Sequence, residues 1–208
     1  MANRTSKRWV SPLYAVSMTL AFCFGLLALV EGAPPQAELN VPESDRTVPY
    51  VPTPLEVVKK MLDMAKVGPQ DVLYDLGSGD GRIVIMAAQK YGAKAVGVEL
   101  DTGRFKESSA RLTELGLEKR AKIVQGNLFE TDVRAATVVT LYLLPDVNQR
   151  LRPRLEKELR PGARVVSHNY SLDTWEAEQV ETVTSADGVE HTIFLYVLPQ
   201  PRPATGTK

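Results

Sequence analysis

From residue 54 onward, the hydrophobic positions alternate between helical spacing and strand spacing. Residues 54–66 carry apolar side chains three and four positions apart, which predicts a helix with one buried face. Short apolar runs at 71–75, 94–99 and 121–125 are typical of strands. The run TVVTLYL at 137–143 is apolar almost without interruption, as in a strand covered on both faces.

Helices are expected between these strands, but near the C-terminus two strands follow each other without a helix between them. The Asp187-Gly188 pair favours a tight hairpin turn between the last two strands. The remaining expected elements are helices at 80–91, 101–116 and 145–160 and strands at 163–167, 178–184 and 190–198. This order predicts an α/β fold, a Rossmann-like doubly wound seven-stranded sheet that is mostly parallel with an antiparallel C-terminal hairpin strand.

The N-terminal 31 residues differ from this domain. Residues 13–30 carry no charge and follow Arg4, Lys7 and Arg8. A helix of that length would be roughly 27 Å long, close to the roughly 30 Å of a hydrocarbon core, so it predicts a single-pass membrane anchor. A signal peptide cleaved before export and a mitochondrial presequence are the alternatives. The expected organisation continues with a proline-rich linker at 32–54, the domain at 55–198 and a disordered tail at 199–208.

Composition excludes several classes of function. Lys and Arg together number 25, as do Asp and Glu, so the formal net charge is zero and no nucleic-acid partner is expected. The single cysteine, Cys23, lies in the apolar N-terminal run, so the domain has no disulfide framework. His168 and His191 lack carboxylates at ligand spacing, and no metal is expected.

The cluster Gly-Ser-Gly-Asp-Gly at 77–81 lies between the first strand and the next helix. Arg82 stands where a dinucleotide-binding motif needs glycine, and no Lys-Ser/Thr pair follows, as a phosphate-binding loop would require. Asp75 would repel a pyrophosphate but attract an ammonium group. Glu99, twenty residues after Gly79, can accept both hydroxyls of a ribose. A ligand with a ribose, a positive charge and no phosphate is S-adenosyl-L-methionine.

Three segments, DLGSGDGR, VGVELD and GNLFE, resemble successive motifs of class I S-adenosylmethionine-dependent methyltransferases. The resemblance covers roughly residues 50–198. DLGSGDGR, YVPTPLEVV and LRPGARVVSHNYSLDTW are also similar to a narrower group and its bacterial relatives. That group comprises membrane-anchored protein-lysine methyltransferases that act on the adenine nucleotide translocase or the ATP synthase c-subunit. It implies a protein substrate, with a membrane protein as one expected kind.

The resemblance also implies which residues bind the cofactor. Asp75 and the loop residues would line its methionine end, Glu99 its ribose, and Asn127 with Leu128 its adenine. Asn127 departs from the aspartate common in relatives, although its amide can still pair with adenine. The full expected set is Tyr50, Thr53, Asp75, Gly77, Ser78, Gly79, Gly81, Glu99, Asn127 and Leu128. A tight turn is the alternative role for the glycine cluster and for Asn127, and a cap or a strand end is the alternative for Asp75 and Glu99.

Methyl transfer to a lysine requires a neutral amine, whose usual pKa is about 10.4, so a poorly solvated acceptor channel is expected at the end of the fourth strand. The candidates for catalysis are Tyr142, His168 and Asn169, with a core or structural role as the alternative for each. The Asn/Asp-Pro-Pro-Tyr/Phe motif of many amino-methylating relatives is absent from the sequence there. A small-molecule or lipid methyltransferase, and a non-catalytic cofactor-binding module at a membrane, are the alternative functions.

The helix expected at 145–160 carries a basic run that includes Arg150, Arg152 and Arg154. Glu156 and Glu158 are interleaved with it, which is typical of a solvated helix face. A surface for a partner or for lipid headgroups is the alternative interpretation.

Overall fold

The computed structural model describes residues 50–200. The expected membrane anchor or signal, most of the expected linker and residues 201–208 of the expected tail lie outside the described residues. The helices are α1 (Leu55–Met64), α2 (Arg82–Lys90), α3 (Thr102–Glu114) and α4 (Pro145–Glu158). The strands are β1 (Val72–Leu76), β2 (Lys94–Glu99), β3 (Ala121–Gln125), β4 (Val138–Leu141), β5 (Arg164–His168), β6 (Gln179–Thr184) and β7 (Glu190–Val197).

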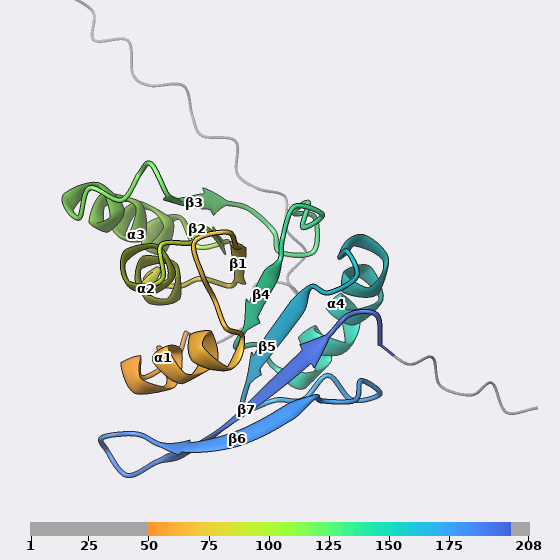
Figure 1. Ribbon diagram of the computed structural model, residues 1–208. Coiled ribbons are helices and arrows are strands. Elements are labelled where there is room, and N and C mark those ends of the chain that lie inside the picture. Colours follow the sequence, from red (N-terminus) through yellow and green to blue (C-terminus); the bar gives the residue numbers. More distant parts are fainter. Residues whose placement is uncertain (1–49, 201–208) are drawn as a thin grey trace, which may run out of the picture. The chain divides into compact units, whose positions relative to one another are not determined.

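The seven strands form one sheet in the order β3-β2-β1-β4-β5-β7-β6 (Figure 1). The first five pair in parallel, whereas β7 runs antiparallel to both β5 and β6. The predicted fold class is therefore confirmed, including the closing hairpin. Strand β4 ends at Leu141, so Tyr142 follows it, and His168 is the last residue of β5 rather than the first beyond it.

Two hydrophobic cores lie on opposite faces of the sheet. One contains buried side chains of α1, α2 and α3, such as Val58, Val84 and Leu112. The other contains those of α4, including Leu151 and Leu155, with Trp175. Figure 1 shows α4 apart from the other three helices, as a doubly wound sheet requires. Because both faces are covered, every residue of the central strand β4 is buried, which explains the nearly uninterrupted apolar run seen there in the sequence.

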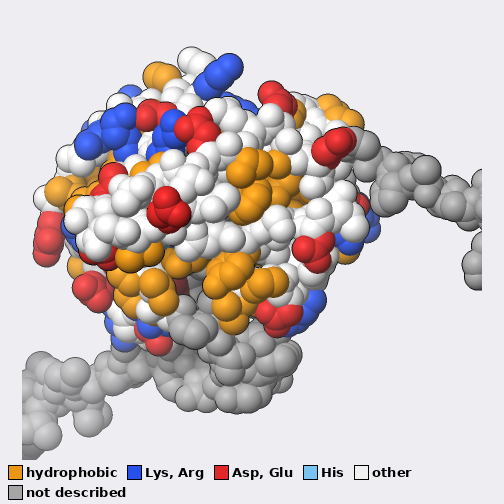
Figure 2. Space-filling view, turned by 90° about the horizontal axis from the view of Figure 1, so that it is seen from below, with side chains coloured by type: hydrophobic (Ala, Val, Ile, Leu, Met, Phe, Trp, Pro, Cys, Tyr) orange, Lys and Arg blue, Asp and Glu red, His pale blue; other side chains and the backbone are white. Residues whose placement is uncertain are grey.

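The surface mixes charges of both signs. On the face drawn in Figure 2, acidic and basic side chains surround several groups of hydrophobic side chains. Among residues 50–200, no helix combines the length and apolar character needed to cross a membrane.

Candidate cofactor and acceptor site

The predicted site residues lie at or just beyond the carboxyl ends of β1 to β5, except Tyr50 and Thr53, which precede α1. Strand order reverses between β1 and β4, because β2 lies on one side of β1 and β4 on the other. Asp75 pairs in register with Gly97 of β2 and with Thr140 of β4. In open α/β sheets, this reversal opens the crevice in which ligands bind.

The glycine loop turns sharply over the end of β2. Backbone N–H groups of Gly77 and Ser78 both donate to the Val98 carbonyl at 2.9 Å. Gly77, Gly79 and Gly81 have φ values of +86°, +55° and +76°, which favour glycine. A Cβ on Gly79 would lie 2.5 Å from the Tyr50 ring, so the loop backbone remains bare beneath that ring.

Two residues of the cluster also make close packing contacts within the protein. A Cβ on Gly81 would lie 3.2 Å from Ser108 Cβ, and Gly81 caps the start of α2, so its missing side chain lets α2 pack closely. The Ser78 side chain points under the loop, because a Cβ on Gly97 would lie 2.6 Å from Ser78 Oγ. Gly97 was not among the predicted site residues, although a glycine inside an apolar strand signals such a close approach.

Glu99 connects the end of β2 to the glycine loop. Its Oε2 accepts the Gly79 backbone N–H at 2.7 Å, and its Oε1 accepts that of Asp101 at 2.8 Å. Arg104 adds an ion pair at 3.5 Å. A carboxylate offers about four lone pairs, so Glu99 can still accept hydroxyl donors from a ribose.

Asp75 is a buried carboxyl, only 3% exposed. Burial raises its pKa to about 7, the nearby Glu99 adds to the rise, and the hydrogen bond from Thr140 Oγ1 at 2.8 Å opposes it. A cation beside Asp75 would favour the ionised form. This carboxyl is therefore suited to a positively charged ligand group.

Residues 50–54 lie over the loop and are held there by Arg82. Both oxygens of Asp80 accept from the Arg82 guanidinium, whose Nη1 donates to the Thr53 carbonyl at 2.8 Å. The Arg104 guanidinium lies 5.1 Å from the centre of the Tyr50 ring. The sequence predicts Tyr50 and Thr53 at the site but not these arginines, because their roles depend on contacts across the fold.

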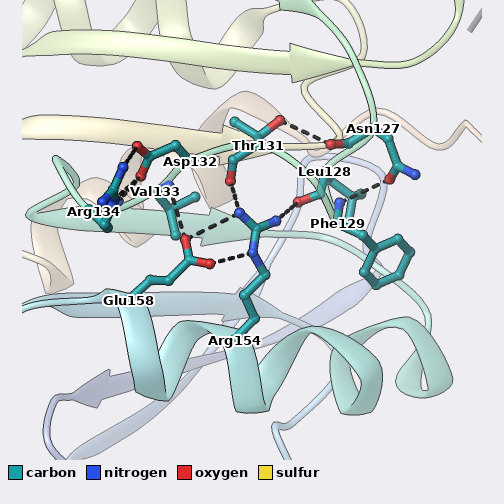
Figure 3. A network of polar contacts seen from close by, with 9 residues as sticks. All are labelled: Asn127, Leu128, Phe129, Thr131, Asp132, Val133, Arg134, Arg154 and Glu158. Atoms are coloured by element: carbon teal, nitrogen blue, oxygen red, sulfur yellow. Dashed lines mark hydrogen bonds and ion pairs between the residues drawn. The ribbon is translucent and has the colours of Figure 1, made fainter.

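The segment carrying Asn127 and Leu128 is fastened to α4 (Figure 3). Asn127 Oδ1 accepts the Phe129 backbone N–H at 2.9 Å. Arg154 donates to the carbonyls of Leu128 (3.2 Å) and Thr131 and to Glu158 (2.7 Å). The interpretation of this basic run as a solvated face is therefore wrong for Arg154, because backbone carbonyls of a neighbouring segment draw its guanidinium inward.

The side on which the acceptor is expected, at the ends of β4 and β5, is aromatic. The Tyr142 ring lies over the His168 ring, with centroids 3.9 Å apart, and Tyr170 lies 6.4 Å from Tyr142. Beside them, the fully buried Asn148 of α4 approaches the Tyr170 carbonyl at 3.5 Å. Its Oδ1 has no hydrogen-bond partner among residues 50–200. Asn148 was missed because an amide in a polar helix has no sequence signal of burial.

His168 is fully buried, and its ring bonds on both edges. Nδ1 lies 3.2 Å from Thr53 Oγ1, and Nε2 lies 2.9 Å from His191 Nδ1. Burial, together with His191, lowers its pKa to about 3. The third predicted catalytic residue is placed differently, because Asn169 Oδ1 accepts the Thr192 backbone N–H at 3.0 Å. This bond ties Asn169, whose φ is +62°, to β7 at the point where β5 ends.

These residues fit S-adenosyl-L-methionine on structural grounds. A buried carboxyl suits the ammonium group, a second carboxylate at the end of β2 suits the ribose, and the glycine backbone allows close approach. Within residues 50–200, no group of three or more His, Cys, Asp or Glu side chains could hold a metal ion.

Comparison with known proteins supports the same chemistry. Residues 75–179 match the model of the ANTKMT methyltransferase domain. A protein-lysine N-methyltransferase of Saccharolobus islandicus is 51% identical over 152 residues, covering 73% of this chain and 94% of that protein. The ATP synthase c-subunit lysine N-methyltransferase of Mus musculus is 32% identical over 151 residues, covering 72% of this chain and 58% of that protein's length.

One solved structure is also close in sequence. It is described as an RNA methyltransferase from Salinibacter ruber in complex with S-adenosyl-L-homocysteine. That protein is 45% identical to this chain, with a TM-score of 0.70, covering 76% of this chain and 100% of the other. S-adenosyl-L-homocysteine is what remains of S-adenosyl-L-methionine after methyl transfer, which agrees with the cofactor expected from the sequence.

Proposed function

This chain belongs to the ANTKMT methyltransferase family, and from that premise we propose that it transfers a methyl group to the side-chain amine of a lysine in a protein. The donor is S-adenosyl-L-methionine. The observation that carries the proposal is the 51% identity with the archaeal protein-lysine N-methyltransferase, because the alignment covers 94% of that protein. The geometry at the ends of β1, β2 and β4 supports it.

The chain's own residues position the donor. Asp75 binds the ammonium group, and Glu99 accepts the ribose hydroxyls beside the bare backbone of Gly79. Asn127 and Leu128 border the adenine from the segment that Arg154 fastens to α4. When bound, the donor supplies a methyl group already activated by a sulfonium, so the protein mainly aligns the acceptor and excludes water.

The acceptor side suits an amine in its neutral form. Tyr142 and Tyr170 offer aromatic faces, and Asn148 offers a buried carbonyl oxygen. A poorly solvated site lowers the pKa of an amine and favours loss of its proton. The nitrogen lone pair then attacks the methyl carbon, the N–C bond forms, and the C–S bond breaks in line. The electron pair of that bond remains on sulfur.

The test is acceptor mapping with the full chain. Purified protein is incubated with isotopically labelled S-adenosyl-L-methionine and a proteome in which native methylation has been removed, and the products are read by mass spectrometry. We expect mass gains of one to three methyl groups on lysine side chains. Retained cofactor binding without any lysine product would contradict the proposal and favour a non-catalytic module, and label in small molecules or lipids would favour those acceptors.

RNA is the second candidate acceptor, because a protein 45% identical to this chain is described as an RNA methyltransferase. Equal numbers of basic and acidic residues argue against it, as does the mixture of both signs on the face in Figure 2. The same incubation with total RNA, followed by nuclease digestion and nucleoside analysis, discriminates between them. Label in a nucleoside, with none in lysine, would replace the proposed acceptor.

The proposal includes a membrane setting. The mouse relative is named for lysine methylation of the ATP synthase c-subunit. Residues 13–30 of this chain carry no charge over a length near that of a membrane span. We therefore expect a membrane-protein acceptor and attachment through residues 13–30. Alkaline extraction of membranes should leave the full chain in the pellet, whereas Leu20→Arg should release it. Release of the unaltered chain would contradict attachment.

A further inference from the structure

A row of five side chains leads from the acceptor side to the molecular surface. Thr53 Oγ1 lies 3.2 Å from His168 Nδ1, and His168 Nε2 lies 2.9 Å from His191 Nδ1. His191 Nε2 lies 3.1 Å from Ser185 Oγ, which in turn bonds the carboxylate of Asp187. The row joins residues from the segment over the glycine loop, from β5, from β7 and from the β6–β7 turn.

The row has a direction that its outer end determines. Ser185 Oγ contacts two oxygens that only accept, the Asp187 carboxylate and the Val189 carbonyl at 3.0 Å. Its single hydrogen points to the nearer of them, Asp187 Oδ1 at 2.5 Å, so the hydroxyl oxygen accepts from His191 Nε2–H. A neutral His191 then accepts at Nδ1, which requires His168 to donate from Nε2.

The same reasoning extends to the inner end. With Nε2 carrying the hydrogen, neutral His168 accepts at Nδ1, and Thr53 Oγ1 donates to it. Every hydrogen bond in the row therefore runs from Thr53 toward Asp187. The lone pairs of the Thr53 hydroxyl remain able to accept a hydrogen from an acceptor amine.

Only the last residue of the row is exposed to solvent. Thr53, His168, His191 and Ser185 are each at most 8% exposed, whereas Asp187 is exposed to solvent. The inner members lie out of contact with bulk water, and the last one meets it. A chain of groups that both accept and donate, ordered in one direction and open to water at one end, can carry a proton outward.

We propose that Thr53, His168, His191, Ser185 and Asp187 form a proton relay that removes a proton from the acceptor amine before methyl transfer. The inference rests on the proposed function, since only an amine that enters as an ammonium ion must lose this proton. The ammonium N–H bond breaks, Thr53 Oγ takes the proton, and each member passes its own hydrogen to the next. Asp187 receives the last one and releases it to water.

Titratable groups from several elements lie around the row. The Tyr142 ring, just after β4, packs against the His168 ring at an interplanar angle of 37°, and Tyr170 follows β5. Glu56 of α1 accepts the Ala186 backbone N–H at 2.6 Å, which places a carboxylate beside the β6–β7 turn. Hydrogen bonds from Ser185 and from the Val189 backbone keep the pKa of Asp187 below its usual value, so Asp187 enters as a carboxylate.

The pKa of His168, about 3, has a mechanistic consequence. A buried imidazole with so low a pKa does not store a proton at neutral pH. It can still accept at one nitrogen while it donates from the other, as in a concerted transfer. His168 therefore conducts a proton rather than serving as its resting place.

The decisive experiment compares His191→Gln with wild type in the full chain, using a lysine protein acceptor found by the mapping above. Glutamine can accept from His168 and donate to Ser185, but an amide does not exchange its two roles on the time scale of catalysis. We expect kcat at pH 7 to fall about 10- to 100-fold and to recover as pH rises toward the amine pKa of about 10.4. The dissociation constant of S-adenosyl-L-methionine and the melting temperature should stay near wild type.

Two further variants complete the design. Asp187→Asn still accepts from Ser185 but takes up no proton, so it should show a smaller fall with the same recovery at high pH. Glu190→Gln, an exposed change at the start of β7, is the matched control and should match wild type.

The outcomes separate the relay from the proposed function. If wild type methylates lysine and His191→Gln has the same pH profile as wild type, the relay is overturned but the proposed function stands. A loss in His191→Gln that is equal at every pH also overturns it, because that pattern indicates a structural role. Failure of wild type to methylate any lysine overturns the proposed function and the relay with it.

Discussion

The cofactor side and the acceptor side of the site are built from different kinds of sequence information. On the cofactor side, Asp75, the glycine loop and Glu99 lie within 25 consecutive residues and interact through backbone groups. On the acceptor side, Thr53 and His168 bond across 115 positions. The first side is therefore encoded locally, while the second exists only when β5, β7 and the segment before α1 come together.

The same physical cause gives the two sides opposite titration behaviour. Burial raises the pKa of Asp75 to about 7 and lowers that of His168 to about 3. In both cases desolvation penalises the charged form. The cofactor side can regain its charge when a cation binds to Asp75. On the acceptor side the imidazole stays neutral, as a relay requires.

The largest expected effect is on the cofactor side, from Gly79→Ala. The φ of +55° strains any other residue, and the added Cβ would lie 2.5 Å from the Tyr50 ring, so the loop or the ring must shift. We expect affinity for S-adenosyl-L-methionine to fall on the order of 100-fold by calorimetry, about 2.7 kcal/mol. Gly188→Ala is the control, because its φ is also positive but no atom lies within 4 Å of the new Cβ. If both variants lost cofactor affinity equally, the loss would be due to backbone strain and not to the contact between the new Cβ and the Tyr50 ring.

Asp75→Asn should weaken the same binding about 10- to 100-fold at pH 8, since it removes a charge-assisted hydrogen bond to the ammonium group. In the wild type, the folded pKa of about 7 lies above the unfolded value. The stability of the free protein that depends on this group is therefore full below about pH 4 and is lost as pH rises through 7, by at most about 4 kcal/mol.

The same variant thus has opposite effects on binding and on stability. The melting temperature of free Asp75→Asn should exceed that of wild type at pH 8, and the difference should vanish near pH 4. Differential scanning calorimetry at the two pH values measures it. Wild-type affinity for the cofactor should also decline below pH 7, by up to about tenfold per pH unit. A pH-independent affinity would exclude Asp75 as the ammonium ligand.

On the acceptor side, Tyr142→Leu should leave cofactor affinity unchanged. The ring that covers His168 is lost, while an apolar side chain of smaller volume remains. We expect kcat/KM for the protein acceptor to fall roughly tenfold, about 1.4 kcal/mol of transition-state stabilisation. Steady-state kinetics with varied acceptor, together with calorimetry for the cofactor, measures both. A parallel loss of cofactor affinity would show that the two sides are not separable.

Among the variants expected to weaken cofactor binding, Arg154→Ala should have the smallest effect. It releases the carbonyls of Leu128 and Thr131 and should lower the free energy of unfolding by about 1–3 kcal/mol, with a cofactor affinity only about three- to tenfold weaker. Chemical denaturation and calorimetry report the two changes. Arg134→Ala removes an exposed ion pair with Asp132 and should change neither. If Arg154→Ala binds the cofactor as tightly as wild type, the segment carrying Asn127 and Leu128 does not depend on Arg154 for its position.

The sequence by itself determined the order and type of the elements, because each carries its own hydrophobic period and the Asp187-Gly188 turn marks the hairpin. It also determined the class of cofactor, since Asp75, the glycine loop and Glu99 follow one another at spacings imposed by one strand-helix-strand unit. Local chemistry is visible in a sequence when the residues that carry it are neighbours in the chain.

Only the tertiary structure decided which polar side chains face the site and which hold the fold. Ser78 turned beneath the loop, Asn169 bonded to β7, and Arg154 left the solvated face of its helix for the carbonyls of another segment. The row from Thr53 to Asp187 likewise needs four segments in contact. The physical reason is that a hydrogen bond depends on distances of about 3 Å, and packing of remote elements sets those distances.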